Sequence, residues 1–178
     1  MTEGAAKFPP PFEVYRARDA GDFEKADMMY GDGSISQAVG EASQALVDEG
    51  MLEGSKLRVL YRRPGGLSLS YAWFKSGFPL PLHSHSTPCL YYVVAGSLRI
   101  GTQELGPGDG FYLDPDTPYI YTPGPDGVEV LEFRDTDRFD IKIRSSNVKW
   151  WHKALEKLKI SKLSWPAQVK PPSGLNLP

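Results

Sequence analysis

The chain is poor in the two residue types that most often build covalent or metal centres. Cys89 is the only cysteine among 178 residues, and His83, His85 and His152 are the only histidines. A single cysteine excludes an intramolecular disulfide. It also fits a reducing compartment, so we predict a cytoplasmic location. With three histidines and one cysteine, any metal site can draw on only a few nitrogen and sulfur ligands.

Charge of one sign and long apolar runs are also lacking. Lysine and arginine number 20 and aspartate and glutamate 22, for a net charge of −2. This balance argues against a nucleic-acid-binding surface. The longest strongly apolar run, residues 89–95, is far too short to span a bilayer, and residues 1–12 contain no apolar core of signal-peptide length. We predict neither nucleic acid nor membrane as a partner.

Glycine, proline and alternating apolar residues are abundant. The chain has 18 glycines and 16 prolines, which suits many short strands joined by tight turns. From residue 56 the apolar pattern has a period of two, most cleanly over residues 67–74. A further strand is expected over residues 12–17, and a tight turn at Gly96-Ser97. This regular spacing predicts a β-barrel or sandwich.

Helical patterns flank the strand-rich region. A helix capped by Ser34 or Ser36 is expected to run to Glu49, before Gly50, and another to run from Asn147 to about Ile160. A short helix is expected over residues 22–29. We therefore predict an N-terminal arm and helix over 1–55, a barrel over 56–145, and a C-terminal helix with an irregular tail over 146–178.

Two of the three histidines are one residue apart, in His83-Ser84-His85. In an extended strand, side chains at i and i+2 point to the same side. Both imidazoles are therefore expected to face one point inside the barrel.

The residues around this pair resemble the cupins. Gly77 is followed by five residues, by the histidine pair and then by Gly96 in register, and Gly108-Asp109 begins a second, weaker signature. The resemblance covers roughly residues 56–135. It implies an all-β, double-stranded β-helix (jelly-roll) barrel, here with flanking N- and C-terminal helices.

The resemblance also implies a metal site, but the ligand positions differ from the family pattern. A typical metal cupin supplies three histidines and a glutamate, whereas this chain has Cys89 at the glutamate position and Tyr119 at the third histidine position. The candidate metal ligands are therefore His83, His85 and Cys89. The expected cofactor is one divalent transition metal, iron first, with zinc, copper, nickel or manganese as alternatives.

Aromatic residues extend the predicted site. Tyr119 and Tyr121 are candidate catalytic residues, and Tyr71, Trp73 and Tyr91 are candidates for binding a planar organic substrate. The alternatives stay open: a vestigial histidine pair, a core cysteine, and tyrosines that fill the barrel. Strand parity does not decide whether Arg58, Arg62, Glu132 and Arg134 face the pocket or solvent.

Three functions compete at this point. The first is a mononuclear metal oxidoreductase, dioxygenase-like, that cleaves a small aromatic or carbonyl-bearing substrate with oxygen. The second is a metal-free binding or sensing module, and the third a metal-free isomerase or cyclase with Tyr119 and a histidine as acid and base. The long extensions before residue 56 and after 145 are expected to cover the barrel or to form a homodimer.

Overall fold

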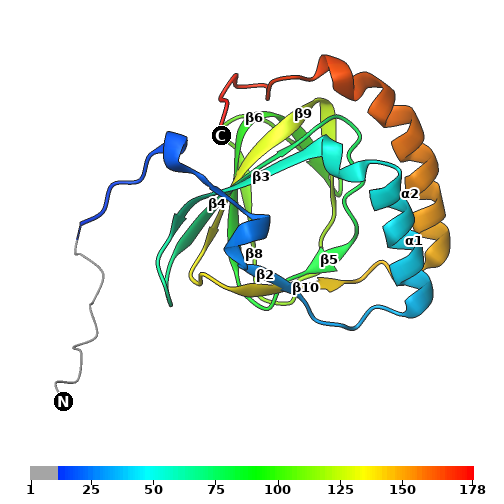
Figure 1. The fold of residues 1–178 in the computed structure, drawn as a ribbon, viewed down its shortest axis with the longest axis horizontal. Coiled ribbons are helices and arrows are strands. Elements are labelled where there is room, and N and C mark those ends of the chain that lie inside the picture. Colours follow the sequence, from blue (N-terminus) through cyan, green and yellow to red (C-terminus); the bar gives the residue numbers. More distant parts are fainter. Residues whose placement is uncertain (1–11) are drawn as a thin grey trace.

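The computed structural model describes residues 12–178, which form two β-sheets closed into a barrel (Figure 1). The large sheet is antiparallel throughout. Its strand order is β1 (Gly21–Asp22), β3 (Ser55–Arg62), β4 (Ser68–Phe74), β9 (Tyr121–Arg134), β6 (Cys89–Ile100) and β7 (Gln103–Leu105), with β8 (Gly110–Leu113) also paired to β6. The all-β barrel predicted from the alternating pattern is confirmed.

A small second sheet holds His83, and His85 follows directly after its strand. Its order is β2 (Met29–Gly31), β10 (Phe139–Ile143) and β5 (His83–Ser84), where β10 is parallel to β2 and antiparallel to β5. An isolated antiparallel bridge joins His83 to Tyr119. Backbone pairing therefore brings Tyr119 beside the histidines, although 36 residues separate it from His83 in sequence.

Two helices lie side by side along one side of the barrel, α1 (Gln37–Asp48) and α2 (Val148–Ser161) (Figure 1). Both begin at residues that the sequence indicates, because the side chains of Ser36 and Asn147 accept hydrogen bonds from the first turns. The inner faces of both helices are buried in the main core. Short 3-10 helices, η3 (Met51–Gly54) and η4 (Lys162–Ala167), follow them. Across residues 12–178, no helix combines the length and apolar composition needed to cross a membrane.

The N-terminal segment differs from its predicted structure. Residues 12–16 are irregular and lead into η1 (Ala17–Asp19), so the strand expected over 12–17 is wrong. The helix expected over 22–29 is only η2 (Glu24–Ala26), between β1 and β2. Both short strands pair with the barrel, and Phe23 and Met28 are buried against Phe139. Tertiary pairing here overrides a weak local helical pattern.

The turn expected at Gly96-Ser97 is also wrong, because β6 continues through it to Ile100. The register of β6 against β9 shifts at this point, which marks a bulge. Gly96 has a φ of +72°, and a Cβ there would lie 2.2 Å from the carbonyl oxygen of Gly127. The glycine is therefore required by a bulge and a close strand crossing rather than by a hairpin turn.

Candidate functional site

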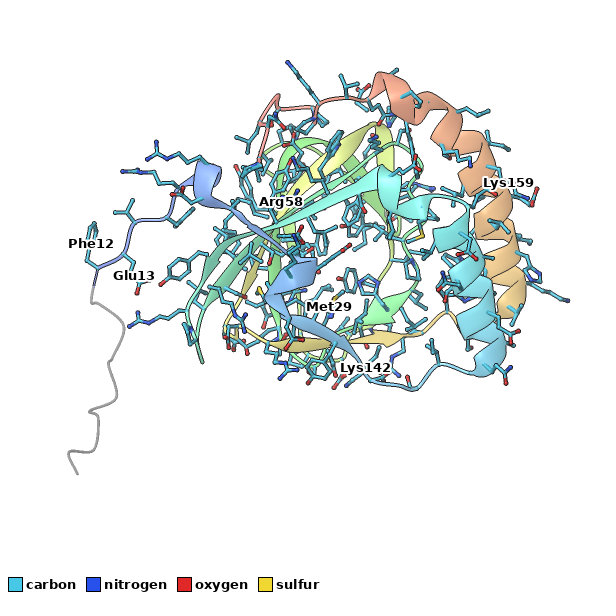
Figure 2. The ribbon with its side chains drawn as sticks, in the orientation of Figure 1. Phe12, Glu13, Met29, Arg58, Lys142 and Lys159 are labelled. Atoms are coloured by element: carbon cyan, nitrogen blue, oxygen red, sulfur yellow. The ribbon has the colours of Figure 1, made fainter. Side chains whose placement is uncertain are left out.

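A cavity of about 440 Å³ lies between the two sheets. Most of its lining is apolar, and its polar residues include both histidines of the pair. Met29 and Arg58, from β2 and β3, are two of its lining residues and are labelled in Figure 2. The residues that carry its chemistry are the half-buried Glu132 and the buried His83, His85, Tyr119, Tyr121 and Arg134.

Backbone carbonyl groups fix the proton positions of both imidazoles. The Nδ1 atom of His83 lies 2.8 Å from the Pro81 carbonyl oxygen, and that of His85 lies 2.5 Å from the Asp140 carbonyl oxygen. A carbonyl oxygen can only accept, so Nδ1 carries the proton in each ring. In the neutral rings Nε2 is therefore an unprotonated acceptor. The interaction that orients each ring also sets its tautomer.

Tyr119 places its hydroxyl between the two Nε2 atoms. Its oxygen is 2.8 Å from Nε2 of His83 and 3.3 Å from Nε2 of His85. The hydroxyl of Tyr91 also bonds to it, and Nη2 of Arg134 donates to the Tyr91 oxygen over 3.3 Å. The hydrogen bonds therefore run from Arg134 through Tyr91 and Tyr119 to His83. Tyr119 has one proton, so Nε2 of His85 keeps a free lone pair.

A buried ion pair forms another part of the cavity wall. Nη1 of Arg134 lies 2.6 Å from Oε2 of Glu132, with side-chain exposures of 1% and 15%. The guanidinium carbon of Arg134 lies 4.0 Å from the centroid of the Phe139 ring, as in a cation–π contact. The positive charge is therefore compensated on one side by a carboxylate and on another by an aromatic face.

Burial keeps the histidines and tyrosines of the site uncharged. Desolvation lowers the pKa of His83, and desolvation followed by the charge of Arg134 lowers the pKa of His85 from 6.5 to about 4. Burial also raises the pKa of each buried phenol, Tyr91, Tyr119 and Tyr121. At neutral pH the histidines are therefore free bases and the tyrosines are proton donors.

Acid is expected to destabilise the protein through these histidines. Below pH 6.5 the unfolded chain protonates His85, while the folded chain does not until about pH 4, so stability falls as the pH falls through this window. From His85 alone, the free energy of unfolding should drop by about 2 kcal/mol between pH 7 and pH 5. Urea unfolding at pH 7 and at pH 5 measures this drop. A His85→Gln variant should show a correspondingly smaller drop in the free energy of unfolding. Equal drops in the two proteins would contradict the assignment of the effect to His85.

The residues present do not fit the predicted metal centre. Within residues 12–178, no three His, Cys, Asp or Glu side chains form a group that could hold a metal ion. Without a metal, burial raises the pKa of the Cys89 thiol to about 12, so the thiol is protonated at neutral pH and is not a preformed thiolate ligand. The Tyr119 hydroxyl lies within hydrogen-bonding distance of both Nε2 atoms. The expected ligand set of His83, His85 and Cys89 is therefore not assembled, and Cys89 is part of the hydrophobic core.

The structure does not place Tyr71 and Trp73 in the cavity, in contrast to their expected role as substrate contacts. They are on the outer face of β4, where they pack with Leu177 of the C-terminal tail. The Tyr71 hydroxyl donates to Glu129 over 2.7 Å. The inner face of β4 presents Ala72 and Phe74 instead.

The other predicted aromatics do face inward. Tyr119 and Tyr121 line the cavity, and Tyr91 lies beside Tyr119 with its ring stacked on Phe111 at 4.4 Å between centroids. Of the four residues whose direction strand parity left open, Arg58, Glu132 and Arg134 line the cavity, whereas Arg62 pairs with Asp137. Phe139 was missed, because its strand joins the site only through pairing with β2 and β5.

Comparisons with known proteins show likeness in fold. No protein-family model and no curated protein matches the chain. A polyketide cyclase, RemF from Streptomyces resistomycificus, aligns at a TM-score of 0.51 and 18% identity over 61% of this chain and 83% of that one. An RmlC-like cupin from Shewanella frigidimarina gives 0.43 and 23% over 48% and 79%. A protein with a cupin-like fold from Ralstonia eutropha gives 0.44 and 19% over 61% and 75%.

Proposed function

From the premise that this chain has a cupin fold, we propose that it is a metal-free enzyme. It moves a proton on a small, largely apolar, carbonyl-bearing molecule, as an isomerase or a cyclase does. His85 is the general base and Tyr121 is the hydroxyl donor, while Tyr119 donates its proton to His83 and leaves the lone pair of His85 free. The likeness to solved cupins supports only the scaffold, which hosts many chemistries, so the proposal depends on the site.

The free lone pair of His85 is the observation that carries the proposal. His85 lines the cavity, its Nε2 is unprotonated, and this nitrogen shares the Tyr119 hydroxyl with the closer His83. A positioned acceptor of this kind is what general-base catalysis needs. The low pKa of His85, about 4, keeps it in its basic form at neutral pH. A base this weak is competent when the carbon acid is activated by a hydrogen-bonded carbonyl.

The proposed step transfers one proton and needs no further reactant. Nε2 of His85 takes a proton from the carbon beside the carbonyl, and the C–H electron pair forms the carbon–carbon double bond of an enolate. The negative charge on the enolate oxygen is stabilised by the hydroxyl donor of Tyr121. Where a second double bond is conjugated with the enolate, the protonated His85 returns the proton to the far carbon of that double bond, and the double bond shifts. Alternatively, the enolate carbon attacks a second carbonyl of the same molecule and closes a ring, and the protonated His85 gives its proton to the resulting alkoxide.

The proposal replaces the oxygen-dependent cleavage expected from the family resemblance. That reaction would pass through a metal, and the donor set of this site does not fit one. The metal-free binding module stays the competing function, because the same cavity could hold a ligand without acting on it.

Deuterium exchange tests the proposal. We expect chelator-treated protein to accelerate incorporation of deuterium from D₂O into 2-tetralone, at the carbon between its ring and its carbonyl, as followed by proton NMR. Acceleration that disappears with the chelator and returns with iron or zinc would favour the metal enzyme. Binding of 2-tetralone without any acceleration would favour the binding module.

A further inference from the structure

The two partners of the buried ion pair are unequally available to a ligand. Arg134 has its Nη1 on Glu132, its Nη2 on Tyr91 and its face on Phe139, and its side chain is 1% exposed. Its Nε is buried and has no hydrogen-bond partner among residues 12–178. Glu132 uses Oε2 for Arg134, yet its side chain is 15% exposed and lines the cavity. Both residues line the cavity, and the carboxylate is the more exposed of the two, so a ligand reaches it more readily than the guanidinium.

Glu132 and His85 make this part of the wall rich in acceptors. An ionised carboxylate only accepts hydrogen bonds, and Nε2 of His85 is an acceptor by its tautomer. An acceptor in an apolar cavity costs free energy when it loses water and gains no donor. The ligand must therefore supply a donor to Glu132 if it is to displace water there.

Charged side chains of both signs line the cavity: Lys56, Arg58 and Arg134 are positive, and Asp22, Glu24 and Glu132 are negative. Among them, Arg134 and Glu132 compensate each other at 2.6 Å. An anionic ligand would place an unpaired negative charge beside Glu132, at a cost that rises steeply in a low-dielectric interior. The part of the cavity beside Glu132 therefore disfavours carboxylates and phosphates.

The remaining wall favours a flat apolar body. Leu57, Phe74, Phe78, Leu80 and Phe139 line the same cavity. Aromatic and aliphatic side chains around a few polar groups are typical of pockets for small organic molecules.

We infer that the ligand is a neutral hydroxylated carbonyl compound, such as a phenolic or enolic ketone, whose hydroxyl donates to Glu132. The carbonyl group of the ligand is inferred from the proposed function, on which this inference rests. The hydroxyl group is inferred from Glu132 alone. Together they name the substrate class of the proposed enzyme.

A matched series of probes tests the inference on the wild-type protein by calorimetry. We expect 6-hydroxy-2-tetralone to bind at least about tenfold more tightly than 6-methoxy-2-tetralone, because a hydrogen bond to a charged group contributes that much. We expect 2-naphthoate to bind more weakly than 6-hydroxy-2-tetralone by a similar factor. Equal affinity of the hydroxy and methoxy probes, tightest binding of the naphthoate, or no binding of the hydroxy probe would each overturn the inference.

A Glu132→Gln variant assigns the preference to one residue. We expect the preference for the hydroxy over the methoxy probe to fall to less than about threefold. Glu104→Gln, an exposed change on β7, should leave it unaltered. Loss of the fold in Glu132→Gln would leave the wild-type series to decide. If the hydroxy probe binds selectively but no deuterium exchange occurs, only the proposed function is contradicted. If deuterium exchange occurs but the hydroxy and methoxy probes bind equally, only this inference is contradicted.

Discussion

Replacement of His85 by glutamine is expected to lower the rate of deuterium incorporation into 2-tetralone by about 10²–10⁴-fold, the usual contribution of a positioned general base. Glutamine has no basic nitrogen, so the C–H proton loses its acceptor. Binding of 2-tetralone should change little, because His85 is one of many lining residues. The loss should therefore fall on the catalytic rate rather than on affinity.

The pH profile separates this role from a structural one. Burial, followed by the charge of Arg134, lowers the pKa of His85 to about 4, so the wild-type rate should be flat above about pH 5 and fall below it. His152→Gln, on the exposed side of α2, is the matched control and should keep the full rate. A fully active His85→Gln variant, or a wild-type profile that breaks at pH 6.5, would contradict the assignment.

Replacement of Arg134 by methionine is expected to cost about 3–5 kcal/mol in the free energy of unfolding, because it leaves the Glu132 carboxylate buried without its cation. The change also removes the donor to Tyr91 and the contact with Phe139. Urea unfolding at pH 7 measures the effect.

A second variant isolates the charge. In the double variant Arg134→Met/Glu132→Gln, no uncompensated carboxylate remains. A substantial part of the lost free energy of unfolding should therefore be recovered. Arg138→Met, which breaks the exposed contact between Arg138 and Asp27, should change stability much less. A single Arg134→Met variant as stable as the wild type would show that the pair contributes nothing to the fold.

Much of the fold could be predicted from local pattern. The alternation that begins at residue 56 predicts the strands, and Ser36 and Asn147 predict the helix starts, because each signal acts within a few residues. The His83–His85 pair was predicted to face one way for the same reason, since the two positions share a strand face. Their ring centroids lie 5.1 Å apart.

The parts that failed depend on contacts distant in sequence. Tyr71 and Trp73 alternate cleanly, but both faces of β4 are buried, the outer one beneath Leu177 at the far end of the chain. Alternation cannot tell which buried face is the interior. The short strands β1 and β2 likewise exist only through their partners β3 and β10.

The chemistry of the site was hidden for a similar reason. The proton positions of the histidines are set by the backbone carbonyls of Pro81 and Asp140, which no side-chain motif reveals. The resemblance to metal cupins pointed to four positions, of which His83, His85 and Tyr119 form a hydrogen-bonded cluster and Cys89 packs in the hydrophobic core. The expected homodimer stays a prediction.

The histidine tautomers test the central claim most directly. Long-range proton–nitrogen NMR spectra of chelator-treated, ¹⁵N-labelled protein resolve the three imidazoles, which His85→Gln and His152→Gln assign. We expect His83 and His85 to be neutral at pH 7 with the proton on Nδ1, and His85 to stay neutral down to nearly pH 4. A proton on Nε2, a charged ring at pH 7, or restoration of a stoichiometric metal-bound state on adding iron or zinc would contradict the account.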